Sequence, residues 1–179
     1  MTEATLAEGT RAVILPILPM DRESLREGYE SLSPLSRNHR FLASVPHLTD
    51  AMLHHLVDDV DGINHVALAL VVLDEHNVGT PVGVARMIRY TDRPTEADLA
   101  VTVLDDWQGH GVATALLSEL MRERPVGVTR IVTTVAADNA ASLAMLRRLG
   151  PTTATPAGID RLDVVVDLVA TEPSTEEQT

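Results

Sequence analysis

Apolar residues along the chain gather in short runs separated by turn-forming residues, which is the pattern of strands buried inside a domain. The first run contains Pro16, which cannot donate a backbone hydrogen bond, so we expect its strand at an edge of the sheet. Two later runs flank a turn-rich stretch at residues 74–79 and predict an antiparallel hairpin. The predicted strands comprise residues 11–18, 65–73, 81–90, 98–104, 130–135 and 162–169.

Other segments repeat their apolar residues with the period of a helix. One such segment begins at Thr49 and ends near Gly62, and residues 112–124 carry a broad apolar stripe opposite a polar face. In the first of these segments, the spacing i, i+3, i+4, i+7 is met by Leu53, Leu56, Val57 and Val60. The predicted helices comprise residues 21–32, 35–41, 49–61, 112–124 and 138–150.

Strands and helices in this order predict a single α/β (α+β) domain built on a mixed sheet. The length of 179 residues suits one ordinary domain and is short for two well-cored ones. We expect the domain at residues 10–169, with a flexible N-terminus at 1–9 and a disordered acidic tail at 170–179.

The charge of the chain narrows the choice of partners. A net charge of −12 results from 26 acidic residues against 14 basic ones, and every basic residue is arginine. This charge repels nucleic acid and anionic membranes and attracts cations, so we expect neither of the first two as a partner. The absence of cysteine excludes disulfides, thiolate nucleophiles and Cys-ligated metals. We expect no metal site, because the adjacent His54 and His55 point to different faces of their predicted helix.

Neither a membrane span nor a secretory signal is visible in the sequence. The longest apolar run, residues 66–73, has eight residues, far below the roughly 20 that cross a bilayer. The N-terminal residues lack the basic region and apolar core of a signal peptide. We therefore expect a cytoplasmic protein.

The segment from Asp98 to Thr114 carries the clearest chemical signal. A strand runs into a turn containing Gly109 and Gly111, and the turn opens directly onto an amphipathic helix. Glycine lets the backbone approach a ligand, and the free N–H groups of a first helical turn attract an anion such as pyrophosphate. A tight turn without a ligand is the alternative. A dinucleotide fingerprint would have a third glycine where Thr114 stands, and a P-loop needs a lysine.

This segment resembles the acetyl-CoA motif of the GCN5-related N-acetyltransferase (GNAT) superfamily, Arg/Gln-x-x-Gly-x-Gly/Ala, which is met by Gln108, Gly111 and Ala113. Residues 138–150 resemble the strand-to-helix segment that follows in that family. The resemblance implies a GNAT fold, with a mixed, mostly antiparallel central sheet and helices on both faces, and acetyl-CoA as co-substrate. It also implies a set of cofactor-binding residues, namely Val101, Thr102, Val103, Gln108, Gly109, His110, Gly111, Val112, Ala113, Thr114, Asn139 and Ser142. Asp105 and Asp106, which precede the turn, are interpreted as turn formers that face away from the phosphates.

Residues 32–41, 46–50 and 98–109 further resemble the acetyltransferase domain of actinobacterial protein lysine acetyltransferases. This resemblance implies a protein lysine as acceptor and a carboxylate base at Asp98, where those enzymes have glutamate, with Glu96 as the substitute. The tyrosine that protonates the leaving thiolate in many GNAT enzymes is replaced by Leu146, and Ser142 is a candidate donor. Two alternatives remain open: a small-molecule amine acetyltransferase, and a CoA-binding regulatory module without turnover. A homodimer is also left open.

Overall fold

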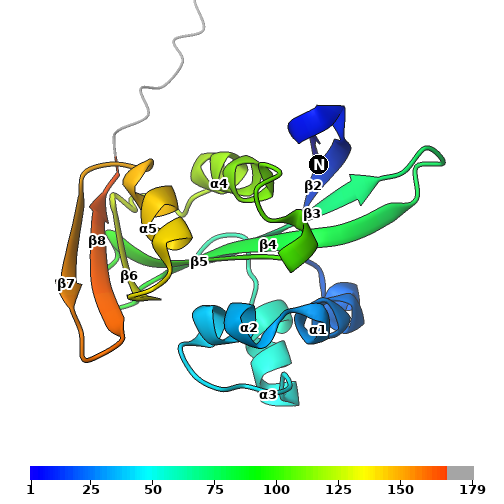
Figure 1. Cartoon of the computed structure of the whole chain (residues 1–179). Coiled ribbons are helices and arrows are strands. Elements are labelled where there is room, and N and C mark those ends of the chain that lie inside the picture. The colour runs from blue at the N-terminus through cyan, green and yellow to red at the C-terminus, as the bar shows by residue number, and fades with distance from the viewer. Residues whose placement is uncertain (169–179) are drawn as a thin grey trace, which may run out of the picture.

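The computed structural model describes residues 1–168 and consists of one eight-stranded sheet with helices on both faces (Figure 1). The strands lie in the order β1-β2-β3-β4-β5-β6-β8-β7. Their bounds are β1 Thr2–Thr5, β2 Arg11–Pro16, β3 His65–Leu73, β4 Gly79–Arg89, β5 Glu96–Val103, β6 Arg130–Ala136, β7 Thr152–Pro156 and β8 Arg161–Asp167.

The helices divide between the two faces of this sheet. Helices α4 and α5 cover one face, and α1, α2 and α3 cover the other (Figure 1). Their bounds are α1 Arg22–Ser31, α2 Pro34–Phe41, α3 Asp50–Leu53, α4 Val112–Arg122 and α5 Ala140–Arg147. Among residues 1–168, no helix is both long and apolar enough to cross a lipid bilayer.

Strand pairing is antiparallel throughout except between β5 and β6. This confirms the mixed, mostly antiparallel sheet and the helices on both faces. The alternation of side chains along each strand supplies a separate apolar core to each helical layer. Ala85 and Met87 of β4 belong to the core beneath α4, whereas Ala67 of β3 belongs to the core beneath α1–α3.

The expectation of a flexible segment at residues 1–9 was wrong. Thr2–Thr5 forms β1, which pairs with β2 along its whole length, and Ala4 packs against the core beneath α4. β2 therefore lies inside the sheet rather than at its edge. The register explains how Pro16 is tolerated there, because β1 reaches only to Ile14 while Pro16 still pairs with Leu68 of β3.

Two other predictions change in detail. The single helix expected from Thr49 to Gly62 is a short α3 followed by a π-helical turn at His54–Asp58, in which the N–H of Asp59 bonds to the carbonyl of His54. The wider turn keeps Leu56 and Val57 buried together. The threonine-rich edge strand β7 was not predicted, since most of it is exposed and carries no apolar run. The expected tail at 170–179 and residue 169 lie outside the described residues.

Candidate active site

The site lies where the two parallel strands part. β5 and β6 pair only at Glu96 with Arg130 and at Ala97 with Ile131, after which their backbones diverge. Beyond that point the Thr133 hydroxyl, rather than a backbone group, donates to the carbonyl of Leu99 at 3.3 Å. The second half of β5 therefore has one edge without a strand partner.

Backbone donors face this open edge. The N–H groups of a strand alternate between its two sides, and the N–H of Leu104 bonds to Val82 on the β4 side at 2.9 Å. By that alternation, the N–H groups of Val101 and Val103 point toward the gap between β5 and β6. These are two of the residues that the sequence nominated as cofactor contacts, and their geometry suits a carbonyl oxygen placed in the gap.

The turn after β5 delivers the N-terminus of α4 to the same place. A short 3₁₀ segment, Asp105–Trp107, is followed by Gly109 and Gly111 at φ 82° and 89°, in the left-handed region that favours glycine. The N–H of Ala115 donates to the carbonyl of Gly111 at 3.0 Å. The N–H groups of the three preceding residues, from Val112 on, therefore have no partner within the helix.

The gap and the turn together form a cleft of about 670 Å³. Of the twelve cofactor-binding residues nominated from the sequence, eleven line it: Val101, Thr102, Val103, Gln108, Gly109, Gly111, Val112, Ala113, Thr114, Asn139 and Ser142. His110 does not line the cleft. Its ring stacks at a tilt 5.7 Å from that of Trp107, and its Nδ1 lies 3.1 Å from the carbonyl of Gln108.

Helix α2 forms a wall of the cleft that sequence reasoning missed. The carboxylate of Asp105 accepts hydrogen bonds from the Ser33 backbone N–H at 2.8 Å and from the Ser33 and Ser36 hydroxyls at 2.9 and 2.7 Å. Burial acts to raise the pKa of Asp105, but these hydrogen bonds outweigh it and leave the pKa below its ordinary value. Asp105 lines the cleft, but its carboxylate is directed at Ser33 and Ser36 and holds α2 against the turn. The Ser33-Pro34 pair, a helix N-cap signal, was the clue available in the sequence.

The start of α5 closes the cleft from the other side. The Asn139 side chain caps α5 by accepting the N–H of Ser142 at 3.0 Å, so the side-chain NH₂ is the part left for a ligand. Asp138 lies 3.1 Å from Nε2 of His39 on α2, a contact that joins the two walls. Leu146 is 1% exposed and packs in the core, away from any leaving group in the cleft.

The two nominated carboxylates lie outside the lining of the cleft. Ala97 and Leu99 point into the core beneath α4, so Asp98 projects toward the α1–α3 face, where its charge acts on Arg40. Burial lowers the pKa of Arg40, and the Asp98 carboxylate partly restores it. Arg40 does line the cleft and so connects it to Asp98. Glu96 lies at the far end of β5 in ion pairs with Arg93 at 2.7 Å and Arg130 at 3.5 Å.

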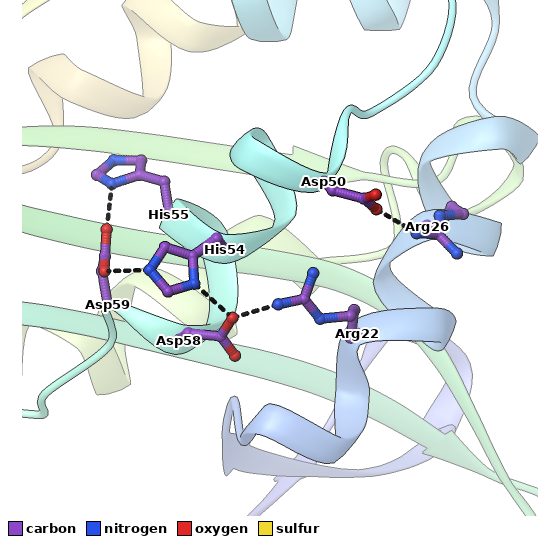
Figure 2. A network of polar contacts seen from close by, with 7 residues as sticks. All are labelled: Arg22, Arg26, Asp50, His54, His55, Asp58 and Asp59. Atoms are coloured by element: carbon purple, nitrogen blue, oxygen red, sulfur yellow. Dashed lines mark hydrogen bonds and ion pairs between the residues drawn. The ribbon is translucent and has the colours of Figure 1, made fainter.

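The paired histidines belong to a surface network of polar contacts (Figure 2). His54 contacts Asp58 at 2.8 Å and Asp59 at 3.5 Å, and His55 contacts Asp59 at 3.0 Å. Arg22 of α1 pairs with the same Asp58 and ties the π-helical turn to that helix. Within residues 1–168, no group of three or more His, Asp or Glu side chains has an arrangement that could hold a metal ion.

Comparison with known proteins agrees with this geometry. Residues 31–150 match the sequence model of the acetyltransferase (GNAT) family. The chain belongs to that family. Among curated proteins, this GNAT chain is 35% identical to acetyltransferase Pat of Mycolicibacterium smegmatis over 136 residues, which cover 75% of this chain and 39% of Pat. It is 30% identical over 117 residues to acetyltransferase PA5475 of Pseudomonas aeruginosa, covering 65% of this chain and 61% of that protein.

Solved structures extend the comparison. The GNAT domain of S. lividans PAT matches with a TM-score of 0.80 and 27% identity, covering 93% of this chain and 96% of that one. A cAMP-binding acyltransferase from Mycobacterium smegmatis matches with a TM-score of 0.62 and 26% identity, covering 94% of this chain and 47% of that one. The chain thus spans 39% and 61% of the lengths of the two curated relatives, and about half of the cAMP-binding acyltransferase.

Acetyl-CoA, the acetyl donor of the GNAT family, suits the residues of the cleft. A diphosphate needs hydrogen-bond donors, and the first turn of α4 offers N–H groups beside glycines that lack a Cβ. The nearby Asp105 carboxylate is engaged by Ser33 and Ser36, so its lone pairs are directed at α2. The turn from Gln108 to Thr114 would hold the diphosphate, and Val101–Val103 would receive the thioester end.

Proposed function

We propose that this GNAT protein transfers an acetyl group from acetyl-CoA to a lysine side chain of another protein. The names of its relatives support acetyl transfer, and the S. lividans PAT domain matches over nearly the whole described chain. The observation that carries the proposal is the cleft itself, in which the unpaired edge of β5 meets the N-terminus of α4. An acidic chain of net charge −12 favours the approach of a cationic lysine over that of an anionic acceptor.

The reaction is direct attack of the neutral amine on the thioester. The amine nitrogen forms a bond to the carbonyl carbon, the carbon–sulfur bond breaks, and CoA leaves as thiolate. The N–H groups of Val101 and Val103 are placed to stabilise charge on the carbonyl oxygen. A lysine ammonium has a pKa near 10.4, so a proton must leave before the nitrogen can attack.

Asp98 is the proposed acceptor of that proton. It lies one methylene short of the glutamate in the protein lysine acetyltransferases that the chain resembles, and it does not line the cleft. The proton therefore travels through a water molecule, and Arg40, which lines the cleft and feels the charge of Asp98, connects the carboxylate to the cleft. Glu96 is the weaker candidate, because two arginines already occupy its oxygens. Leu146 cannot protonate the thiolate, which leaves Ser142 or water as the donor.

Asp98→Asn tests the base. We expect kcat for a lysine peptide to fall at least 100-fold while the Kd for acetyl-CoA stays within threefold of wild type. Asp106→Asn, at an exposed carboxylate just after β5, is the matched control and should keep full activity. Undiminished turnover by Asp98→Asn would remove Asp98 from the mechanism.

A screen of thiol release with acetyl-CoA separates the proposal from its alternatives. Protein and peptide lysines are compared with polyamines, amino acids and aminoglycosides at matched concentrations. We expect the highest kcat/KM on a protein lysine. Faster turnover of a small amine would favour the small-molecule enzyme, and tight acetyl-CoA binding without thiol release on any acceptor would favour the regulatory module.

A further inference from the structure

A second cavity, of about 430 Å³, lies on the other side of β5 from the core beneath α4. Helices α1 and α2 and the strands β2–β5 enclose it, and its walls are mostly apolar. Leu25 and Tyr29 of α1 contribute to the walls, as do Ala69 and Val84 of the sheet. The volume falls within the range of small-molecule sites, roughly 300–1,000 Å³.

Three charged residues interrupt this apolar lining: Asp21 and two arginines. Arg86 of β4 is 4% exposed. Its Nη1 lies 3.0 Å from the carbonyl of Leu56 and 3.2 Å from Nε2 of His65. The second is Arg40 of α2, whose guanidinium lies 4.7 Å from the centre of the Phe41 ring. Within residues 1–168, neither guanidinium forms an ion pair with a carboxylate.

The charge around these arginines is unbalanced. Burial, and next the charge of Arg40, lower the pKa of Arg86 to about 9, so it is still protonated near neutrality. His65 is neutral there, because burial and the Arg86 charge lower its pKa to about 4. Among the described residues, Asp98 is the carboxylate whose charge acts on Arg40. Asp98 is not among the charges that act on Arg86, and the Asp21 carboxylate in the cavity lining already accepts the N–H of Leu18 at 2.8 Å. Within the described residues, Arg86 is thus a buried cation without a carboxylate partner, which is a costly arrangement.

We propose that this cavity binds an organic acid, with its carboxylate on Arg40 and Arg86 and its apolar body between α1 and the sheet. The planar guanidinium fork matches a carboxylate, and a second anion offsets the excess positive charge. The apolar walls suit an acid with an aliphatic or aromatic chain better than a small hydrophilic anion. Arg40 and Thr102 line both this cavity and the acetyl-CoA cleft, so the two spaces adjoin.

That adjacency allows two sources for the same carboxylate. It is either a free acid bound beside acetyl-CoA, or the far end of a dicarboxylic acyl group whose thioester lies at Val101–Val103. The second source rests on the proposed transferase function, whereas the first does not.

Calorimetric titration with octanoate tests the site without any turnover. We expect octanoate to bind at least tenfold more tightly than octanol or octylamine, which share its chain length but lack its charge. Arg86→Gln and Arg40→Gln should each weaken octanoate about tenfold. Arg11→Gln, at an exposed arginine of β2 far from the cavity lining, should leave it unchanged. Circular dichroism and Tm show whether each variant folds. If Arg86→Gln does not fold, octanoate binding by Arg40→Gln, at a half-buried position, tests the proposal.

Equal binding of octanol, or unchanged octanoate affinity in the folded arginine variants, would overturn the proposal. For the source, transfer from glutaryl-CoA is compared with transfer from pentanoyl-CoA, which has the same chain length without the terminal charge. A preference for glutaryl-CoA that Arg40→Gln abolishes identifies an acyl chain. Octanoate binding that persists with acetyl-CoA bound, with no such preference, identifies a free acid. If the wild-type protein binds octanoate but transfers no acyl group to any acceptor, the proposed transferase function fails while the proposed organic-acid site stands.

Discussion

The Asp105 carboxylate accepts both the backbone N–H and the hydroxyl of Ser33, at 2.8 and 2.9 Å, across 72 positions of sequence. Ser33 is also the N-cap of α2, so one side chain joins the start of that helix to the turn that precedes α4. The contact places α2 along the cleft and brings Arg40 between the cleft and the second cavity. The spacing between the two binding spaces therefore depends on this pair.

Removing the carboxylate should loosen both spaces at once. We expect Asp105→Ala to weaken acetyl-CoA about tenfold and to lower the free energy of unfolding by about 1–2 kcal/mol, because it leaves partly buried donors on Ser33 and Ser36 unsatisfied. Calorimetry and urea unfolding measure the two effects. Asp106→Ala is the control. If it loses as much acetyl-CoA affinity and stability as Asp105→Ala, the effect comes from removing a negative charge near the turn and not from the hydrogen bonds to Ser33 and Ser36.

The glycines of the phosphate turn allow a sharper test. Gly111 stands at φ 89° as the N-cap of α4, and a Cβ there would meet no atom within 4 Å. Gly111→Ala should therefore act through backbone strain alone, costing about 1–2 kcal/mol and weakening acetyl-CoA as the turn shifts. Gly28→Ala, in the interior of α1 with equally open space, should instead stabilise the protein by about 0.5–1 kcal/mol. Unchanged acetyl-CoA affinity in Gly111→Ala would place the phosphates elsewhere.

Local sequence patterns were sufficient to predict much of this site. The strand, glycine turn and helix at residues 98–124 are contiguous, so hydrophobic period and glycine placement indicate both the elements and the free N–H groups. The contacts themselves came from the resemblance to the GNAT family, and nine of the eleven that line the cleft fall in this segment. His110 is the exception, because the outward direction of one side chain in a turn depends on its packing against Trp107.

Features that depend on contacts between distant segments could not be predicted from the sequence. The pairing of Asp105 with Ser33, and of His39 with Asp138, joins segments far apart in the chain without any local signal of partnership. Strands β1 and β7 lie at the two edges of the sheet, where a short polar segment gains stability from its neighbour rather than from its own composition. The π-helical turn likewise depends on burial of Leu56 and Val57.

The buried His65 should make stability fall in mild acid. Its pKa is about 4 in the folded protein, below the ordinary value of 6.5, chiefly through burial. Between these two values the unfolded chain binds more protons, so the free energy of unfolding decreases as the pH falls from about 6.5 to 4. We expect His65→Gln to reduce that decrease by about 2–3 kcal/mol in urea titrations across this range. His76→Gln, at an exposed turn, should keep the wild-type dependence of stability on pH. If His65→Gln also keeps it, folding does not lower the pKa of His65.

The absence of lysine makes the direct-attack mechanism testable on the protein itself. All 14 basic residues are arginine, so the N-terminus is the one primary amine that the printed chain offers. After incubation with acetyl-CoA and no acceptor, intact-mass and peptide mass spectrometry should find at most one acetyl group, at that terminus. An acetyl group trapped on Ser142 or on a cleft histidine after rapid acid quenching would instead indicate a covalent acyl-enzyme, which direct attack does not form. Ser142→Ala is the matching variant: an acetyl group carried by the Ser142 hydroxyl would be absent from it, whereas an acetyl group on a histidine would remain.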